Sequence, residues 1–445
     1  MTLLKEVLTS NTTYDVVVVG AGPSGSATAY WLAAAGWKVC LVEKKHFPRE
    51  KTCGDGLTPR SVYQLEEMGL GAELAKHGHR YDGLRAFGFG ASLEMKWPEH
   101  PVFPNYGYTI TRFDLDGLVA QHAQSKGATL LNGVEVVDLL DPFDGAADQL
   151  KGAQGVRVHE KETNTDGEIR ARYIVVADGQ NSRIGRTLGT SRNRDWPMGL
   201  ALRGYYTSDR HDEPWIDSHL DIRDPHGKVV PGYGWIFPLG DGRVNVGVGL
   251  LSTAGAWKGV NTTKLQEYFV AQTADAWGLT EETCLGPATG GRLPMGLALG
   301  PRRGPNTLCV GDATGTINPF NGEGIAYGYE SGRIAAGVLG EALASDDARE
   351  LDLYETRIEE AYGEYYKVAR AFVRIISEPK ILAACVGVGL RIEPMMNQLL
   401  RIMANLMRNQ GKGPAEWGFS AMSKLVDVIP ERAYAMLLGE TGSED

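Results

Sequence analysis

Cys53 lies in the stretch PREKTCGDG (residues 48–56), where a single thiol is surrounded by charged residues and glycines. Such a thiol can be a packing residue, a metal ligand, half of a disulfide, or a reactive group held against a cofactor. The cysteines are odd in number, far apart and free of CxxC spacing, at positions 40, 53, 284, 309 and 385. This spacing argues against a disulfide framework and against a metal site. For the Cys53 thiol, a role in packing and a role as a reactive group both remain possible.

Gly20, Gly22 and Gly25 form a G-x-G-x-x-G pattern between the apolar run VVVV and a segment of small residues at helical spacing. Glycines at such a strand-to-helix turn permit a tight bend and bring backbone N–H groups close to a pyrophosphate. Glu43 ends a second apolar run, where its carboxylate can bind a ribose 2′-OH. The pattern predicts a dinucleotide site.

Two later segments have the same form, a buried strand followed by an acidic residue. RYIVVADG (172–179) reaches Asp178, and TLCVGD (307–312) reaches Asp312. Because these strands are spread over most of the chain, we expect one nucleotide domain assembled from separated segments, as flavoproteins have. In this order the segments resemble the FAD-dependent family that includes aromatic hydroxylases and prenyl reductases.

That resemblance implies that Asp312 binds the ribityl chain of FAD and that the loop NPFNGEGI (318–325) lies beside the isoalloxazine ring. A helix beginning near Gly324 would direct its positive end toward the flavin. Besides the first three glycines and Glu43, the residues expected to bind FAD are Cys53, Gly54, Arg112, Asp178, Asp312, Gly322, Gly324 and Ile325. The chain has no second G-x-G-x-x-G, so we expect NAD(P)H to dock transiently or another protein to donate electrons.

Three aromatic residues alternate in the stretch GYGWIFP (232–238). On a strand Tyr233, Trp235 and Phe237 project from one face. Two glycines, Gly247 and Gly249, leave room on the returning strand. Such a stripe is either ordinary core or the wall of an apolar slot.

The stripe resembles a motif of the geranylgeranyl reductase family, Y-x-W-x-F-P followed by eight residues and G-x-G. The residues that fit this lipid-site motif are Tyr233, Trp235, Phe237, Pro238, Gly247 and Gly249. A second family motif, P-x-x-x-x-C-G-G, fits at Pro48, Cys53 and Gly54 but departs at Asp55, which replaces a glycine. A carboxylate beside the thiol is expected to raise the pKa of Cys53.

The resemblance implies an FAD-dependent reductase that saturates isolated C=C bonds in the polyprenyl or geranylgeranyl chain of a lipid. Such an alkene needs a proton on one carbon and a hydride on the other. By this resemblance Cys53 is expected to lie near the flavin, where it could supply the proton, and Tyr233 or an ordered water could serve instead. Aromatic faces stabilise a developing cation by about 0.5–2 kcal/mol each. The candidate substrates are menaquinone, polyprenyl phosphate and prenyl ether lipids, and the KTCGDGLTPR form of the loop favours the menaquinone side chain.

Two other functions compete with this one. Flavin-dependent halogenases carry W-x-W-x-I-P, which GYGWIFP partly matches, so a halogenase or an aromatic hydroxylase is one alternative. A non-catalytic prenyl-lipid carrier on the same fold is another. The intact glycine pattern, Glu43 and Asp312 argue against a carrier that has lost FAD.

These motifs require an α/β fold, α+β overall, with three regions. We expect a Rossmann-type FAD-binding domain of the aromatic-hydroxylase-like class, an antiparallel-sheet substrate domain and a helical C-terminal region. Their predicted ranges are 12–80, 110–190 and 291–345 for the FAD domain, 81–109 and 191–290 for the substrate domain, and 346–445 for the helices.

The net charge of −10 argues against nucleic-acid binding. The start of the chain lacks the pattern of a secretory signal, and no apolar run reaches the ~18 residues of a membrane-spanning helix. We expect a cytoplasmic protein, peripheral at the inner membrane face, because residues 378–412 combine apolar runs with Arg391, Arg401, Arg408 and Lys412. The alternative for this segment is a helical cap that packs on the FAD domain.

Overall fold

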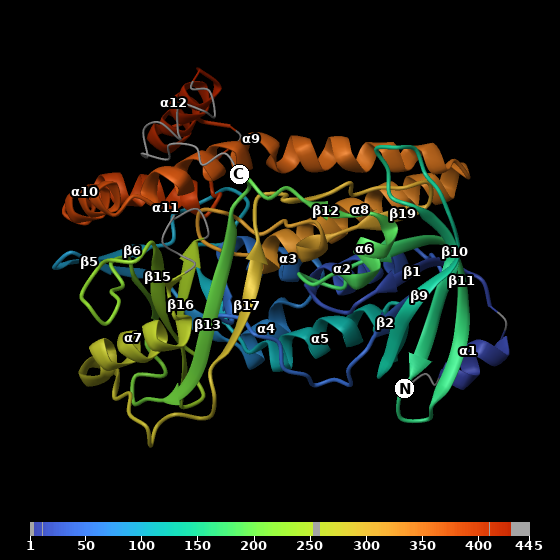
Figure 1. The fold of residues 1–445 in the computed structure, drawn as a ribbon, viewed down its shortest axis with the longest axis horizontal. Helices are drawn as coiled ribbons and strands as arrows, with labels where there is room; N and C mark the ends of the chain where they lie inside the picture. The colour runs from blue at the N-terminus through green and yellow to red at the C-terminus, as the bar shows by residue number, and fades with distance from the viewer. Residues whose placement is uncertain (1–3, 11, 252–258, 409, 429–445) are drawn as a thin grey trace.

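The computed structural model describes residues 4–10, 12–251, 259–408 and 410–428. Two β-sheets lie side by side, with long helices above the first sheet (Figure 1). The first sheet has the order β8-β2-β1-β11-β10-β9, and β19 pairs with β11. Its strands are β1 (Tyr14–Val19), β2 (Val39–Glu43), β8 (Thr129–Asn132), β9 (Val134–Phe143), β10 (Gly152–Glu160), β11 (Thr165–Val176) and β19 (Thr307–Cys309).

The centre of this sheet is parallel and covered on both faces. β1 pairs in parallel with β2 and β11, and β11 pairs in parallel with β19. Such strands read as continuous apolar runs because neither face meets water. The helices α2 (Pro23–Ala34), α5 (Arg112–Ser125) and α8 (Ile325–Ser345) pack on one face. This layer confirms the predicted Rossmann-type α/β class.

The second sheet has the order β17-β13-β16-β15-β14-β5-β6 and is antiparallel except where β14 pairs with β5. Its strands are β5 (Gly83–Gly88), β6 (Ala91–Lys96), β13 (Met198–Thr207), β14 (Trp215–His219), β15 (Gly232–Pro238), β16 (Arg243–Leu251) and β17 (Thr289–Pro294). One face packs on α7 (Thr262–Trp277), where a Cβ on Gly234 would lie 2.5 Å from the Phe269 ring. Residues that alternate with Gly234 along β15 therefore face the other way, toward the FAD domain.

The remaining elements are short or C-terminal. They are α1 (Leu4–Ser10), β3 (Gly56–Leu57), α3 (Pro59–Glu67), α4 (Gly71–His77), β4 (His79–Tyr81), β7 (Gly107–Thr109), α6 (Arg183–Leu188), β12 (Ser191–Arg192), β18 (Leu299–Gly300), η2 (Gly311–Ala313), η3 (Ala348–Leu351), α9 (Asp352–Ile376), α10 (Pro379–Gly389), α11 (Glu393–Met403) and α12 (Pro414–Val428). β3, β7 and β4 form a small antiparallel sheet. The predicted domain boundaries stay a prediction, and their residues 252–258 and 429–445 lie outside the described residues.

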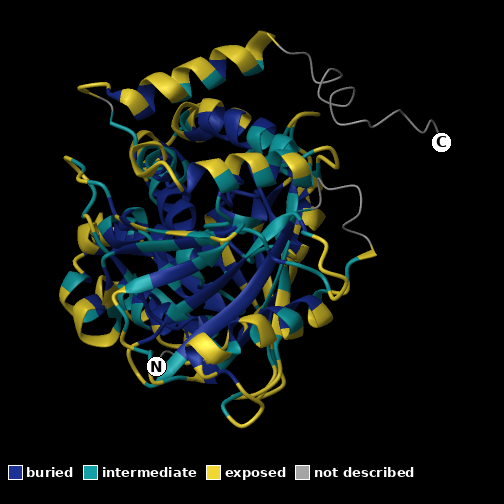
Figure 2. Ribbon diagram, turned by 90° about the vertical axis from the view of Figure 1, so that its left-hand side faces the viewer, coloured by how far each residue is buried: buried dark blue, intermediate teal, exposed yellow. Residues whose placement is uncertain are grey.

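The C-terminal helices divide between two partners. α9 packs along α8, as a cap on the FAD domain would. In contrast, α10 and α11 share an apolar cluster with β5 and β6, so this part of the cap covers the substrate sheet rather than the FAD domain. Apolar contact holds α10 against β5. Gly88 has no side chain and leaves room for Val386, since a Cβ on Gly88 would lie 2.8 Å from a Val386 methyl group. Figure 2 shows α12 as the outermost of these helices, with much of its surface exposed.

Candidate active site

The first glycine turn is closed by direct backbone packing. A Cβ on Gly20, whose φ is +99°, would lie 2.5 Å from the Ala177 carbonyl oxygen, and a Cβ on Gly25 would lie 1.8 Å from the Gly20 carbonyl oxygen. Gly22 is the N-cap of α2 and supplies no side-chain cap. The first N–H groups of α2 are therefore available to an anion. A Cβ on Gly22 would meet only Arg112 Nη2, at 3.8 Å, so the space in front of the helix holds room for a pyrophosphate.

Beneath the turn lies a buried chain of alternating charges. Glu43 accepts a hydrogen bond from the Ala21 N–H at 3.1 Å and pairs with Arg49 at 3.2 Å. Arg49 also pairs with Asp116 at 2.8 Å, and Arg112 binds both Asp116 oxygens at 2.6 and 2.7 Å. This chain holds Arg112 at the start of α5 as a permanent cation beside Gly22, where a phosphate would sit.

The other two predicted acids also follow strands of the first sheet. One Asp178 oxygen accepts a hydrogen bond from the Ile184 N–H at 3.1 Å, whereas the other is buried without a hydrogen-bond partner among the described residues. Asp312 lies within electrostatic reach of Lys51 and Arg112, which oppose the effect of burial on its pKa. Burial raises the pKa of Asp312, and a ligand hydroxyl group that donates to this carboxylate would oppose that shift.

The predicted helix start at Gly324 is confirmed. Gly324 is the N-cap of α8, which runs from Ile325, and a Cβ on Gly324 would lie 3.4 Å from Asp312 Oδ1. Asp312, Gly324 and the first turn of α8 therefore share one location. With the glycine turn, the orphaned Asp178 oxygen and the open end of α2, these groups fit a bound flavin dinucleotide, which supplies a hydride when reduced.

The three predicted aromatic residues form one continuous wall on β15. The ring centroids of Tyr233 and Trp235 are 5.7 Å apart, and those of Trp235 and Phe237 are 6.3 Å apart. Gly247, opposite Trp235 on β16, is required because a Cβ there would lie 2.2 Å from the indole ring. Gly249 is opposite Tyr233, with 3.6 Å to the phenol ring. We call Tyr233, Trp235 and Phe237 the aromatic wall.

Pro238 closes the wall at the end of β15. Its carbonyl oxygen accepts a hydrogen bond from the Thr109 hydroxyl on β7, so the strand end is joined to the small sheet. At the opposite end, the Tyr233 hydroxyl donates to the Asn321 carbonyl at 2.8 Å. The wall is thus held between the small sheet and the loop that precedes α8.

The thiol-bearing loop lies directly on the aromatic wall. A Cβ on Gly54 would lie 3.3 Å from the Phe237 ring and 3.4 Å from Trp235 Nε1. Asn245 fixes the loop, because its Nδ2 donates to the Cys53 carbonyl at 2.9 Å while its Oδ1 accepts from Trp235 Nε1 at 2.9 Å. Cys53, Gly54 and the wall therefore come together as predicted by their shared resemblance, although they are far apart in sequence.

The Cys53 thiol is neutral in this environment. Burial is the largest cause that raises its pKa, and the Asp55 carboxylate adds to it, in the direction predicted from the sequence. Arg112 opposes the shift. For Tyr233, burial first, then Cys53 and Glu323, raises the pKa to about 12. Both predicted acids thus keep their protons at neutral pH.

The sequence did not single out Tyr205, Asn245 or Glu323. Asn245 is fully buried in an apolar strand, RVNVGVG, and that isolated polar residue was a usable signal. Glu323 stands within the loop NPFNGEGI, between Gly322 and Gly324, and a lone acidic residue among glycines was a usable signal there. Tyr205 carried no signal of its own.

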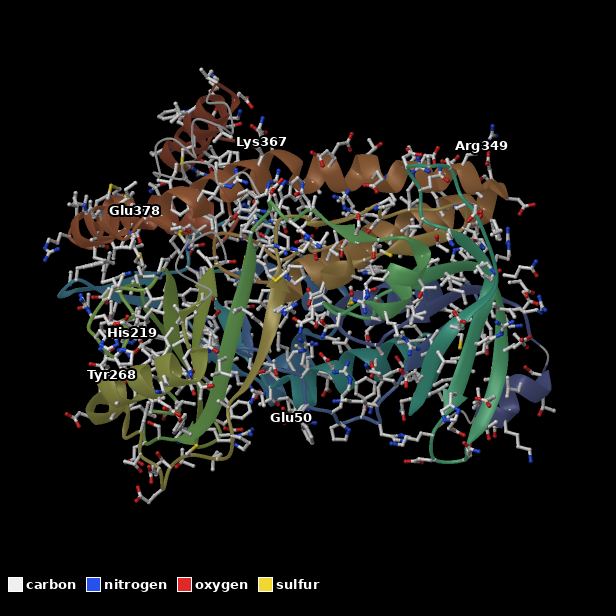
Figure 3. All side chains as sticks on the ribbon, viewed as in Figure 1. Glu50, His219, Tyr268, Arg349, Lys367 and Glu378 are labelled. Carbon is white, nitrogen blue, oxygen red and sulfur yellow. The ribbon has the colours of Figure 1, made fainter. Side chains whose placement is uncertain are left out.

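Figure 3 also shows two polar side chains that lie outside this site: His219 and Tyr268 are on the substrate domain, away from the first sheet.

Three further observations concern the cysteines, possible metal ligands and possible membrane spans. All five cysteines are free. No group of metal-ligating side chains is found among the residues that the structure describes. Within those residues, no helix is both long and apolar enough to cross a membrane.

The FAD binding domain family matches residues 13–202. Menaquinone reductase of Mycobacterium tuberculosis (strain ATCC 25618 / H37Rv) is 40% identical over 94% of this chain and 98% of its own length. Menaquinone reductase of Mycolicibacterium smegmatis is also 40% identical, over 92% of this chain and 94% of that protein. Digeranylgeranylglycerophospholipid reductase 1 of Methanopyrus kandleri is 30% identical over 82% and 91% of the two chains.

Solved structures share the fold. A geranylgeranyl bacteriochlorophyll reductase-like protein from Thermoplasma acidophilum superposes with a TM-score of 0.70 and 22% identity, over 96% of this chain and 99% of that one. A flavin-dependent brominase superposes with a TM-score of 0.69 and 18% identity, over 94% and 99%. The fold alone therefore does not separate a reductase from a halogenase.

Proposed function

The chain belongs to the geranylgeranyl reductase family of FAD-dependent oxidoreductases, and on this basis we propose that it saturates isolated C=C bonds in the prenyl side chain of menaquinone. FAD is its cofactor. The observation that carries the proposal is the aromatic wall facing the Cys53 loop, on a chain 40% identical to two menaquinone reductases. The halogenase alternative has only the shared fold and a partial motif match at GYGWIFP in its favour.

The wall suits the charge that prenyl reduction creates. Protonation of an isolated alkene leaves positive charge on the neighbouring carbon, and the faces of Tyr233, Trp235 and Phe237 can stabilise it. Trp235 is 5% exposed, so the wall also excludes water that would capture the cation. Cys53 and Tyr233 are proposed to line the reacting position, and both are predicted sources of the proton.

Mass spectrometry of the lipid tests the function. The FAD-loaded protein, reduced chemically, is incubated with menaquinone, and each saturated unit should add two hydrogens to the side chain. A halogenated or hydroxylated product, or no product with any prenyl lipid, would reject the proposal.

A matched pair of variants tests the wall. Phe237→Leu keeps an apolar side chain but removes the aromatic face, so turnover should fall by about 2- to 30-fold, as expected for the loss of about 0.5–2 kcal/mol of cation stabilisation. Phe143→Leu, at an exposed aromatic residue on β9, should leave turnover unchanged. Equal rates in both variants would remove the wall from the mechanism.

We further propose that electrons arrive from NAD(P)H, docked transiently. Arg194 and Arg292 lie close enough to Arg192 to lower the pKa of Arg192, after the larger effect of burial, and such a cationic group favours the phosphates of a dinucleotide. In Arg194→Ser, the KM for NADPH should rise while dithionite-driven turnover stays unchanged. A KM that does not move would favour a protein donor at another surface.

The protein is proposed to act in the cytoplasm, against the inner membrane face. Val388 near the end of α10, Ile392 in the turn and Met395 near the start of α11 are exposed apolar residues, and Arg391 lies among them in the sequence. This combination suits the surface of an anionic bilayer. In a flotation assay with anionic vesicles, Ile392→Asp should reduce binding, whereas Leu285→Asp, at a similarly exposed position, should not. Absence of binding by the unaltered chain would reject this location.

A further inference from the structure

Glu323 lies in the loop before α8 and binds two hydroxyl groups. Its Oε1 accepts hydrogen bonds from the Thr58 hydroxyl at 2.5 Å and from the Ser61 hydroxyl at 2.9 Å. Thr58 occupies the N-cap of α3, where a threonine normally caps the helix through its side chain. Here that side chain makes no cap bond and is turned to Glu323 instead. The start of α3 is thus arranged around this carboxyl.

The second carboxyl oxygen of Glu323 has a different environment. Oε2 is buried and has no hydrogen-bond partner among the described residues. A buried anionic oxygen in that position would lack the donors that offset its loss of water. A proton on Oε2 removes the charge and leaves an O–H group without a protein acceptor. The arrangement favours a neutral acid whose O–H is available to a group that enters the site.

Residues 321–323 fix this acid against the aromatic wall. The Tyr233 hydroxyl donates to the Asn321 carbonyl at 2.8 Å, and a Cβ on Gly322 would lie 3.4 Å from that hydroxyl. The Glu323 N–H donates to Asn321 Oδ1 at 2.9 Å, which holds the segment in shape. The Tyr233 proton is therefore engaged by a carbonyl, whereas the Glu323 proton is not.

We propose that Glu323 is the proton donor for saturation of the prenyl C=C bond, an inference that rests on the proposed function. The O–H bond of Glu323 breaks, and its proton forms a C–H bond with one alkene carbon. FAD held by the glycine turn, Arg112 and Asp312 would, when reduced, supply a hydride with its electron pair to the other carbon. The alkene is thereby reduced by two electrons. Thr58 and Ser61 stabilise the carboxylate that remains until solvent returns a proton.

The electrostatic environment suits an acid that works near neutral pH. Burial raises the pKa of Glu323 to about 7, and the hydrogen bonds from Thr58 and Ser61 oppose this shift. An acid with a pKa near the working pH transfers protons most effectively. The pKa of Tyr233 is raised to about 12 and that of Cys53 is raised as well, so both are weaker acids than Glu323.

Charged and titratable groups face Glu323 from several elements. Arg60 on α3 lowers the pKa of Glu323, and Glu330 on α8 raises it. Arg60 and Glu330 are themselves joined at 2.7 Å. The tyrosines whose pKa values Glu323 helps to raise are Tyr81, Tyr233, Tyr327 and Tyr365. These tyrosines stay neutral, so they add no titration of their own near pH 7.

The decisive variant is Glu323→Gln, which keeps the shape and the Oε1 acceptor but has no acidic proton. Saturation of the menaquinone side chain by the chemically reduced, FAD-loaded protein, followed by mass spectrometry of the lipid, should slow by at least about 100-fold, with FAD content unchanged. The unaltered protein should lose rate as pH rises through about 7, and the variant should lack this decline. Glu341→Gln, on the exposed side of α8, is the matched control and should behave as the unaltered protein.

Infrared spectroscopy gives a readout that does not depend on turnover. The unaltered protein, with or without FAD, should show the C=O band of a protonated carboxyl group below pH 7, and this band should fade at higher pH. The component that fades near pH 7 should be absent from Glu323→Gln, whereas bands from other buried carboxyls, such as Asp217 with a pKa of about 6, should be present in both proteins. A component with a midpoint near pH 7 that persists in the variant, or a variant that reduces lipid at the full rate, overturns the assignment of Glu323 alone.

Failure of the proposed function looks different, since the unaltered protein would then reduce no prenyl lipid at all. If Glu323→Gln does not fold, Ser61→Ala replaces it. Loss of a hydrogen bond to the carboxylate should move the decline in rate upward by about half a pH unit. A decline that stays in place in Ser61→Ala overturns the proposal.

Discussion

The Tyr205 hydroxyl donates a hydrogen bond of 2.6 Å to the Asp55 carboxylate, which joins the thiol-bearing loop to the substrate sheet. Asp55 has a φ of +64°, in the left-handed region that favours glycine. Its carboxylate also accepts from Asn245 at 2.8 Å and from the Arg112 N–H at 3.1 Å. The family motif has glycine here, and in this chain three hydrogen bonds stabilise a residue that the backbone disfavours.

Loss of the Tyr205 hydroxyl should weaken this junction. Tyr205→Phe leaves a buried carboxylate with one donor fewer, so the free energy of unfolding should fall by about 1.5–3 kcal/mol. Tyr106→Phe removes an exposed hydrogen bond to Glu66 and should change it by less than 1 kcal/mol. Denaturant titration of both variants measures the difference. Equal stabilities would mean that Asp55 does not depend on Tyr205.

The two glycines of β16, Gly247 and Gly249, should differ sharply in how well they tolerate replacement by alanine. Gly247→Ala places a Cβ 2.2 Å from the Trp235 ring, and forced repacking should lower stability by about 1–3 kcal/mol. Gly249→Ala meets its nearest neighbour at 3.6 Å and should be tolerated. Thermal unfolding and tryptophan fluorescence report both effects. A stable Gly247→Ala protein with unchanged fluorescence would contradict this geometry.

A buried ion pair fastens β5 to β14 at the far end of the substrate sheet. Arg85 binds Asp217 at 2.7 Å, and Asp217 is 1% exposed. Arg85→Met leaves that carboxylate without its cation and should destabilise the protein by about 3–5 kcal/mol. Arg80→Met breaks an exposed pair with Asp82 and should be nearly neutral. Chemical denaturation distinguishes the two, and similar losses would refute the distinction.

FAD retention should depend on Arg112. Its guanidinium lies beside Gly22 and is oriented by Asp116 through two hydrogen bonds. Arg112→Gln removes the cation expected to face the pyrophosphate, so the dissociation constant for FAD should rise by about 10- to 100-fold. Fluorescence titration of the apoprotein with FAD measures this change. Arg333→Gln, an exposed site on α8, should retain full affinity.

Titration of Glu323 should lower the free energy of unfolding as the pH rises. The folded-state pKa of about 7 lies above the unfolded value of about 4.3, so the folded protein binds the proton more tightly. The stabilisation is complete below about pH 4 and is lost as pH rises through about 7. In Glu323→Gln the slope of unfolding free energy between these limits should be smaller. Identical slopes would show that Glu323 does not titrate in this range.

The sequence predicted those parts of the fold that depend on neighbouring residues. The glycine turn at Gly20, the strand acids and the start of α8 after Gly324 follow from local patterns. The alternation of aromatics also placed Tyr233, Trp235 and Phe237 on one face. Contacts between residues far apart in the sequence are not indicated by any local pattern. The bond from Thr58 to Glu323 spans 265 residues, and periodicity cannot indicate which distant side chains meet.

The placement of the C-terminal helices shows the same limit. The basic and apolar residues after Glu378 predicted a basic amphipathic helix. The structure has two helices there, α10 and α11, and of the four basic residues Arg391, Arg401, Arg408 and Lys412 only Arg401 lies in one of them. Which surface they cover depended on the shape of β5 and β6, including the absence of a side chain at Gly88. A helical pattern specifies an apolar face but not the surface that receives it.

The late position of β19 has a consequence for synthesis of the protein. β19 completes the first sheet beside β11, yet most of the substrate sheet, strands β13 to β17, is translated between the two strands. Until Thr307 leaves the ribosome, the edge of β11 has no neighbour there, and Asp312 and α8 do not yet exist to hold FAD. Nascent chains should therefore acquire their cofactor only near the end of translation, and a chain ending before Thr307 should purify without the yellow colour of flavin.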